Sequence, residues 1–423
     1  SGTSCLGTLQ LSSDSFSTCV QMFTSPTASD SNKTFTLDPA SNLSYNTTYK
    51  VKVTTDAKDS AGNALASAYT HSTGFTTSST PDTTAPTVSS SSPADSATSV
   101  SVSSTIAVTF SEAMDTTTVT TNTSNTTCSG SLQVSSGSFS TCVQMSSTPS
   151  VSNSNKTFTV DPSNILSYTT TYKIRVTTGV KDAAGNTMSS QYETSSGFTT
   201  KSPSATAIAA GSYHNCALLD NASVKCWGRN QYGQLGIDNT TTMGDDSGEM
   251  AVLPSVNLGT GRTATAISAG SNHTCALLDN ASVKCWGYNN KGQLGIDNTT
   301  NMGDGSGEMA VLPTVNLGTG RTATAISAGY YHSCALLDNA SVKCWGYNGN
   351  GQLGIDSQTQ MGDGSGEMAV LPTVNLGTGR TATAISAGFF HDCALLDNAS
   401  VKCWGRNNVG QLGIGNTTNM GSA

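Results

Sequence analysis

The chain has 423 residues, enough for two to four domains, and only 11% of them are charged. Its formal net charge is −8 and it has no basic run, which argues against nucleic acid as a partner. No apolar stretch approaches the roughly 18 residues that span a bilayer. Composition therefore excludes the nucleic-acid-binding and membrane-spanning classes of protein.

The twelve cysteines fall into six local pairs with two spacings, 14 residues in the first two pairs and 10 in the other four. The pairs are Cys5 and Cys19, Cys128 and Cys142, Cys216 and Cys226, Cys275 and Cys285, Cys334 and Cys344, and Cys393 and Cys403. An even count with this regularity indicates disulfides, whereas structural zinc needs C-x2–4-C spacings that the chain lacks. We therefore expect an oxidising location, extracellular or at a cell surface.

Two copies of one unit make up the first half of the chain. Residues 1–80 align with 124–203 without a gap at an offset of 123. Apolar and polar residues alternate along Tyr172–Val176, which predicts a half-buried strand. The Asp-x-x-Gly-Asn elements at 59–63 and 182–186 are typical of turns. Short strands, frequent turns and no helical period predict a β-sandwich.

The segment 84–115 gives this unit a family resemblance. It ends in Phe110-Ser111-Glu112-Ala113-Met114-Asp115, and the element "GVKDAAGN" follows at 179–186. These motifs resemble the bacterial Ig-like domains of S-layer and other large surface proteins. Glu112 and Asp115 are candidate calcium ligands, and a plain turn at the end of a strand is the alternative.

We expect a complete Ig-like domain at 81–203 and the C-terminal two-thirds of another at 1–80. The first copy lacks the residues equivalent to 84–123, which carry the core strand "TIAVTF". Such a sandwich would expose apolar faces and unpaired edges. Either the chain is a fragment of a longer array, or a neighbouring molecule donates the missing strands.

From residue 204 the chain repeats every 59 residues, with the word "DNASVKCWG" in each copy. Cys275 and Cys285 are symmetric about Asn280, so a three-residue Asp-Asn-Ala loop would place them opposite each other in a hairpin. A disulfide can join such positions and would add about 2–3 kcal/mol per repeat.

The residues C-A-L, C-W-G and G-Q-L-G of these repeats resemble the regulator-of-chromosome-condensation family, also seen in a secreted bacterial inhibitor of β-lactamases. The resemblance implies seven-bladed β-propellers with four-stranded blades. Residues 204–423 hold four units, the last one truncated, and each unit carries an acidic insertion. The expected fold is therefore all-β: tandem Ig-like β-sandwiches, the first incomplete, followed by about four RCC1-like β-propeller blades.

Two sets of repeated polar residues are candidate metal ligands. The histidines His214, His273, His332 and His391 precede a cysteine by two residues, and a structural role is the stronger interpretation. The acidic insertions suit calcium, or form solvated loops in which Glu249 pairs with Arg262 and its equivalents. Their residues are Asp238, Asp245, Glu249, Asp297, Asp304, Glu308, Asp356, Asp363 and Glu367. The sequence predicts no other cofactor.

Positions that vary between otherwise identical repeats are the candidate contact surface. They lie after "AG" and before "GQLG", where variation either tunes binding or reflects neutral drift. The aromatic candidates are Tyr213, Tyr232, Tyr330, Tyr331, Phe389 and Phe390. The sequons at Asn221, Asn280, Asn339 and Asn398 are candidate glycosylation sites at the hairpin tips.

No catalytic set emerges. The chain has no G-x-S-x-G elbow, no cysteine outside the six pairs and no carboxylate pair that breaks the repeats. We expect a non-enzymatic, adhesin-like surface protein, an Ig-like stalk displaying an interaction module. Its partners would be copies of itself, other surface proteins or glycans. The alternatives are a filament completed by strand donation and a secreted protein-binding or inhibitor propeller.

Overall fold

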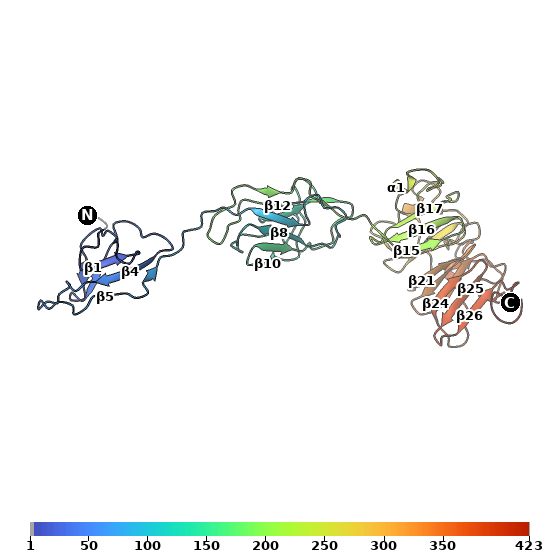
Figure 1. The fold of residues 1–423 in the computed structure, drawn as a ribbon. Helices are drawn as coiled ribbons and strands as arrows, with labels where there is room; N and C mark the ends of the chain where they lie inside the picture. The colour runs from blue at the N-terminus through green and yellow to red at the C-terminus, as the bar shows by residue number, and fades with distance from the viewer. Residues whose placement is uncertain (1–3, 423) are drawn as a thin grey trace. The chain divides into compact units, whose positions relative to one another are not determined.

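The computed structural model describes residues 4–422, which divide into two compact units on either side of the Lys201–Ser202 bond. Figure 1 shows strands in both units. The helices of residues 4–422 are three four-residue turns, all in the second unit. None of the helices in residues 4–422 has the length and apolar character needed to cross a membrane. The fold is all-β.

The complete Ig-like region is a sandwich of two antiparallel sheets. One sheet has the order β10 (Ser150–Ser152), β11 (Thr157–Val160), β8 (Ile106–Phe110) and β7 (Val88–Ser92). In the other, β12 (Thr171–Val176) pairs with β9 (Leu132–Ser135), β13 (Tyr192–Glu193) and β14 (Phe198–Thr199). The inward residues of β8, β11 and β12 alternate with partly buried ones and form the core, as the period of two dictates.

The first copy has the same second sheet but only part of the first. Strand β4 (Thr48–Val53) pairs with β1 (Leu9–Ser12), β5 (Tyr69–Thr70) and β6 (Phe75–Thr76). Strands β2 (Thr27–Ser29) and β3 (Thr34–Thr36) form a two-stranded sheet. Phe35 on β3 is 55% exposed, whereas its counterpart Phe158 is fully buried against β8. The apolar face that the sequence predicted is therefore uncovered within residues 4–80.

The second unit consists of four three-stranded antiparallel sheets, one per repeat. Their first strands are β15 (Ala205–Ala210), β18 (Ala264–Ala269), β21 (Ala323–Ala328) and β24 (Ala382–Ala387). Their middle strands are β16 (His214–Leu219), β19 (His273–Leu278), β22 (His332–Leu337) and β25 (His391–Leu396). Their last strands are β17 (Val224–Gly228), β20 (Val283–Gly287), β23 (Val342–Gly346) and β26 (Val401–Gly405).

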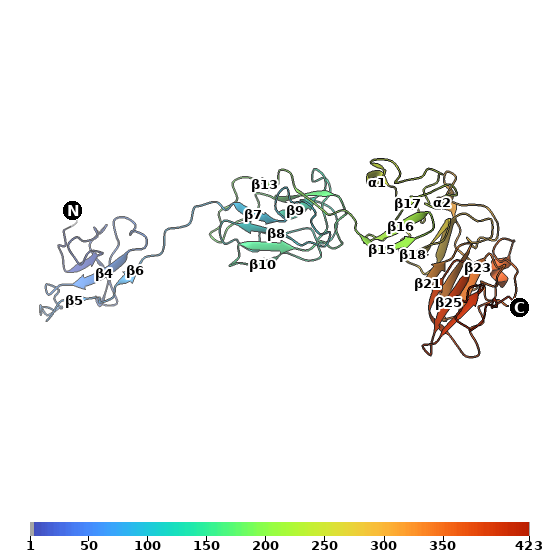
Figure 2. The same ribbon diagram turned by 45° about the vertical axis from the view of Figure 1, so that its right-hand side comes forward.

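Each sheet contacts the sheet of the next repeat, and Figure 2 shows this succession from another side. The family resemblance implied a fourth strand per repeat. The structure has in its place an isolated bridge, such as Gly228 with Met243, because the acidic insertion turns away directly after that residue. Each insertion in the first three repeats contains a four-residue helix: α1 (Glu249–Val252), α2 (Glu308–Val311) and α3 (Glu367–Val370).

Tryptophan joins neighbouring repeats. The indole N–H of Trp286 donates to the backbone carbonyl of Gln234, 3.1 Å away in the preceding repeat. Trp345 and Trp404 repeat this bond to Gln293 and Gln352. Because Trp286 and Trp345 are fully buried, each contributes both apolar area and a satisfied hydrogen bond to the interface. The invariant word "CWG" is thus part of the scaffold.

Candidate binding face

The hairpin of each repeat is closed by a disulfide. Cys275 and Cys285 are directly opposite in the register of β19 and β20, and their sulfurs are bonded. The Asp-Asn-Ala loop closes where the N–H of Leu278 donates to the carbonyl of Ser282, 2.9 Å away. The other repeats and both Ig-like copies contain the remaining five predicted disulfides. Residues 4–422 contain no free cysteine.

The repeat histidines lie between neighbouring sheets. Nε2 of His214 is 2.7 Å from the hydroxyl of Thr274, which itself donates to the carbonyl of Gln234. The imidazole Nε2 is therefore the donor. His273 makes the same bond to Ser333 at 2.9 Å. Burial lowers the pKa of His214 to about 4 and that of His273 to about 3, so both rings are neutral at pH 7.

The third interface replaces the hydroxyl with a carboxylate. Nε2 of His332 lies 2.7 Å from Oδ2 of Asp392, and both side chains are buried. Cys334 completes a His–Cys–Asp group of metal-ligand geometry, but its sulfur is already bonded to Cys344. A disulfide sulfur is not a thiolate ligand. His214, His273 and His332 therefore have a structural role, each hydrogen-bonded to a side chain of the next repeat.

Seven rings form a continuous ladder across the four repeats, which we call the aromatic ladder. It contains five of the six predicted aromatics and two further tyrosines, which are in contact order Tyr232, Tyr288, Tyr331, Tyr330, Phe389, Phe390 and Tyr347. The sixth predicted aromatic, Tyr213, lies beside the ladder, where the guanidinium of Arg229 contacts both the Tyr213 and the Tyr232 rings. Successive ring centroids are 3.9–5.8 Å apart.

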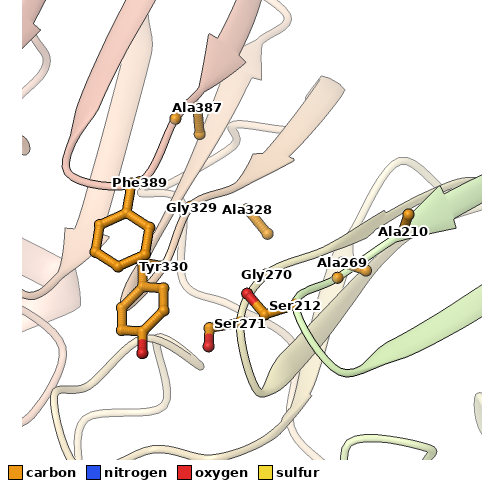
Figure 3. Close-up of a pocket in the computed structure, with 12 residues that line it drawn as sticks. Ala210, Ser212, Ala269, Gly270, Ser271, Ala328, Gly329, Tyr330, Ala387 and Phe389 are labelled. Atoms are coloured by element: carbon orange, nitrogen blue, oxygen red, sulfur yellow. The ribbon is translucent and has the colours of Figure 1, made fainter. Parts of the chain in front are cut away.

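The ladder is open to solvent at its end in the fourth repeat. Phe389 is 54% exposed, and the centroid of its ring lies 3.9 Å from that of Tyr330. Figure 3 shows the two rings next to each other. Burial, and then the Tyr330 hydroxyl, raise the pKa of Tyr331 to about 12, so that its hydroxyl stays protonated. The ladder therefore presents neutral rings with hydroxyl groups at their edges.

A hollow of about 320 Å³ lies beside Tyr330 and Phe389. Its remaining lining is the Ala-Gly pair at the end of the first strand of each repeat, together with Ser212 and Ser271 (Figure 3). Glycine is required there because a Cβ on Gly270 would lie 2.3 Å from the His273 ring and 2.4 Å from the Gly329 carbonyl. The hollow therefore exposes backbone and small polar groups rather than large apolar side chains.

Carboxylates of the acidic insertions accept hydrogen bonds from backbone N–H groups. Oε2 of Glu308 accepts hydrogen bonds from the N–H groups of Gly303 and Gly305, both at 2.8 Å. Oδ1 of Asp238 accepts from the N–H of Met309 in the next repeat, 2.8 Å away. Glu249, Glu367 and Asp297 make the equivalent bonds. Within residues 4–422, no three acidic side chains of one insertion lie close enough together to hold a metal ion.

The arginine that follows each insertion forms a salt bridge with a different residue from the glutamate that the sequence suggested. Arg262 forms a salt bridge with Asp279 at the hairpin tip, at 3.3 Å, and not with Glu249. Arg321 and Arg380 pair in the same way with Asp338 and Asp397. The aspartate of the invariant word is the nearer partner because the hairpin tip folds back onto the end of the loop, where Thr263 N–H also donates to Asp279.

Glu112 lies in a carboxylate group that also contains Asp82 and Asp182. Burial, followed by Asp82, raises the pKa of Glu112. Asp115 is not in this group; its Oδ1 accepts from the N–H and hydroxyl of Thr117. Asp182 accepts from the backbone and side chain of Asn186, which closes the predicted Asp-x-x-Gly-Asn turn. The structure thus separates the two residues that the motif suggested as a pair.

The four sequon asparagines sit at exposed hairpin tips. Oδ1 of Asn280 accepts from the N–H and the hydroxyl of Ser282, at 3.2 and 2.7 Å. Asn221, Asn339 and Asn398 repeat this turn. The side chains stabilise the local turn and remain accessible.

Both parts of the chain match known protein families. The bacterial Ig-like domain family matches residues 7–77 and 82–200. The regulator of chromosome condensation (RCC1) repeat family matches 205–234, 264–293, 323–352 and 382–411, and a second RCC1 family matches 223–277 and 282–336. The chain carries bacterial Ig-like domains followed by RCC1 repeats. Domains of both kinds generally serve as scaffolds and not as catalysts.

The RCC1 repeats also relate the chain to curated proteins. It is 28% identical to the ultraviolet-B receptor UVR8 of Arabidopsis thaliana over 49% of this chain and 43% of that protein. It is 30% identical to the probable E3 ubiquitin-protein ligase HERC4 of Homo sapiens over 51% of this chain and 18% of that protein. The chain thus spans less than half the length of these relatives.

Two solved structures are similar to parts of the chain. Yeast RCC1 (Prp20), solved bound to Kap60, has a TM-score of 0.41 and 18% identity over 60% of this chain and 56% of that chain. The N-terminal part of the bacterial S-layer protein SbsC has a TM-score of 0.21 and 17% identity over 46% of this chain and 41% of that chain.

Two residues of the aromatic ladder were not among the aromatic candidates predicted from the sequence. Tyr288 and Tyr347 follow the invariant "CWG", at the position that Arg229 and Arg406 occupy in the first and last repeats. Like the positions after "AG", this one varies between otherwise identical repeats, and that variation was the available signal. Burial raises the pKa of Tyr288, which bridges Tyr232 to Tyr331.

Proposed function

We propose that the chain is a non-enzymatic extracellular surface protein whose RCC1 repeats form an interaction module, displayed by the Ig-like domains. The observation that carries the proposal is the aromatic ladder. Its rings come from positions that vary between repeats, while the surrounding word is invariant. Clustered, partly exposed aromatics are typical of binding hot spots.

Several features support the rest of this proposal. Six disulfides favour an oxidising compartment, and bacterial Ig-like domains are typical of surface proteins. The acidic and histidine side chains of the repeats are engaged in structural hydrogen bonds. We infer that the repeats are propeller blades and that the module binds a partner without chemical change.

Selection from a random peptide library tests the module, because an exposed aromatic binding surface captures peptides whatever its natural ligand. We expect the recovered peptides to lose binding to the double variant Tyr330→Ser/Phe389→Ser by at least tenfold. The matched control is Val311→Ser/Val370→Ser, which removes two exposed apolar side chains from α2 and α3. Peptides that bind both double variants and the parent equally would exclude the ladder as the binding surface.

A second candidate function is assembly through strand addition, favoured by the open edge of β3. In the complete copy, β11 pairs with β8 in the register Phe158–Val108 and Val160–Ile106. Within residues 4–80, β3 pairs only with β2. A strand of the β8 type, supplied by a neighbouring molecule, would cover Phe35 and complete the sandwich.

A peptide of residues 103–112 tests this second candidate when it is added to the full chain. We expect it to bind, and Phe35→Asp to abolish binding. Phe23→Ser is the control, since Phe23 is exposed but its counterpart Ser146 lies on the surface of the complete copy. Absence of binding to the parent chain, or equal binding to the Phe35→Asp variant, would reject strand addition.

A further inference from the structure

We propose that the aromatic ladder binds an acidic polysaccharide, with sugar rings stacked on the aromatic faces and carboxylates held by Arg229, Lys291 and Arg406. This inference rests on the proposed function and names the ligand class of the same surface. It is carried by the juxtaposition of the ladder with three cations that have no carboxylate partner.

The shape of the ladder favours an elongated ligand. Its contacts pass from Tyr232 of the first repeat through Tyr288 and Tyr330 to Phe389 of the fourth. A small molecule would occupy only one or two of these rings. A chain molecule can contact several repeats at once, and its contacts then add to one another.

Two of the three cations contact aromatic rings. The guanidinium of Arg229 lies 5.3 Å from the centroid of the Tyr213 ring and 5.8 Å from that of Tyr232. Nζ of Lys291 lies 6.0 Å from the centroid of Tyr347. The backbone N–H of Arg406 donates to the carbonyl of Phe390 at 2.8 Å, which places the backbone of this arginine next to a ladder residue. Arg229 and Lys291 are thus held near rings on which a flat ligand ring can stack, and Arg406 occupies in the fourth repeat the chain position that Arg229 has in the first.

Arg229 and Arg406 differ from the other arginines of the repeats, and Lys291 shares with these two the lack of a carboxylate partner within the described residues. Arg262, Arg321 and Arg380 each form a salt bridge with a hairpin aspartate. Arg229, Lys291 and Arg406 form none with the residues that the structure describes; Arg229 donates instead to the Gln231 side chain. In a chain of net charge −8, cations without carboxylate partners on one face indicate an anionic ligand.

The small number of cations indicates that the anionic ligand has widely spaced charges along its length. Asp304 and Asp363 lie next to the turns at Gly233 and Gly292, where they accept hydrogen bonds from Asn301 and Gln360. They add negative charge near the edge of the face. Nucleic acid carries a charge on every nucleotide, and its binding rests on many phosphate contacts. Three cations near two carboxylates fit a polymer with a carboxylate only every few rings.

The polar groups around the ladder suit sugars better than a peptide. Apart from the rings of Tyr330 and Phe389, the hollow is lined by the repeated Ala-Gly pairs and by Ser212 and Ser271, and no other large apolar side chain of residues 4–422 lines it. The variable triplets add exposed amides at Gln231, Asn290 and Asn408. A pyranose ring has an apolar face of C–H groups, which stacks on an aromatic ring, and a rim of hydroxyls, which amides and tyrosines can bind.

Binding of three polymers to the full chain tests the proposal by titration at low and physiological salt. The probes are hyaluronate, with one carboxylate per two sugars, neutral dextran and the polynucleotide poly-dT. We expect hyaluronate to bind most tightly and to lose affinity as salt rises. Tyr330→Ser/Phe389→Ser should weaken it at least tenfold, and Arg229→Gln/Lys291→Gln at least fivefold with a smaller salt dependence. Val311→Ser/Val370→Ser should bind as the parent does.

Other outcomes overturn the proposal. Dextran binding equal to hyaluronate would remove the role of the cations, and tighter binding of poly-dT would make the ligand a nucleic acid. Self-association of the chain that hyaluronate does not disrupt would make the occupant a second copy.

If no polysaccharide binds while library peptides still depend on Tyr330 and Phe389, only the ligand class is wrong. If both fail, the proposed function fails. The Arg229→Gln/Lys291→Gln variant changes only surface side chains, so the test remains valid if the aromatic variant misfolds.

Discussion

The imidazole of His332 and the carboxylate of Asp392 meet at 2.7 Å between the third and fourth repeats, in a position where the other interfaces have His–Thr and His–Ser pairs. Both side chains are almost completely buried. A carboxylate thus replaces a hydroxyl group as the partner of the histidine, while the distance from Nε2 to the partner oxygen stays within 2.7–2.9 Å. The consequence is that the three interfaces have different sensitivities to mutation.

Removal of the Asp392 carboxylate should destabilise the repeats. Asp392→Ala leaves the buried Nε2–H of His332 without an acceptor, which costs about 1–3 kcal/mol. Asp392→Ser restores the hydroxyl found at Ser333 and should recover part of that loss. Chemical denaturation of the full chain, monitored by tryptophan fluorescence, measures both. Equal stability of the Ala variant and the parent would show that the bond contributes nothing.

Acid should destabilise the repeats well above the pH at which their carboxylates titrate. The pKa values of His214 and His273 are lowered to about 4 and about 3, from the ordinary 6.5. The unfolded chain therefore binds more protons than the folded chain below pH 6.5. Stability is fully present above pH 6.5 and is lost as the pH falls through the folded pKa values.

Denaturant unfolding between pH 7.5 and 4 checks this prediction. With about 1.4 kcal/mol per unit of pKa shift, the two histidines account for a loss on the order of several kcal/mol. His273→Gln should reduce the pH dependence, whereas His71→Gln, in the first Ig-like copy, should leave it unchanged in the repeats. A flat stability profile over this range would contradict the buried, neutral histidines.

Asp238 and Asp356 occupy equivalent positions at the start of two insertions, but we expect them to contribute differently to the free energy of unfolding. Oδ1 of Asp238 accepts from Met309 N–H at the first turn of α2 in the next repeat. Loss of such a bond typically costs about 1 kcal/mol. Asp238→Ala should therefore lower the free energy of unfolding by about that amount. Asp356→Ala is the matched control, because Asp356 makes no such bond within the described residues. Thermal melts of the two variants give the comparison.

Each hairpin disulfide should contribute independently. Replacing Cys275 and Cys285 together by alanine opens a loop of 10 residues and should lower stability by about 2–3 kcal/mol. Intact mass before and after reduction of the parent chain should reveal twelve thiols only after reduction. Alkylation of any cysteine without reductant would contradict the compartment that we propose.

Much of the architecture can be predicted because it is local and repeated. The symmetric spacing of Cys275 and Cys285 about Asn280 places them opposite each other in any hairpin with that loop, and the structure has that register. The offset of 123 between the Ig-like copies predicts equivalent strands, and β4 and β12 are indeed equivalent. Period-two patterning needs no knowledge of distant contacts.

The candidate site is less predictable because it joins residues from four repeats. Variation at fixed positions singled out Tyr330 and Phe389 as candidate contact residues, but their 3.9 Å stacking depends on how one sheet packs on the next. Tyr288 and Tyr347 enter the ladder only through that packing. Arg262 has two acidic neighbours in sequence, and only the folded loop selects Asp279 over Glu249.

The sequence by itself determined the strands, the hairpin disulfides and the two kinds of repeat, since each depends on contacts within a few tens of residues. Tertiary structure alone decided which residues meet between sheets: His332 with Asp392, Trp286 with Gln234, and the rings of the ladder with one another. The physical reason is that a repeat fixes its own backbone geometry through local pairing. The angle and offset between neighbouring repeats arise from packing of their buried faces, which no single repeat contains.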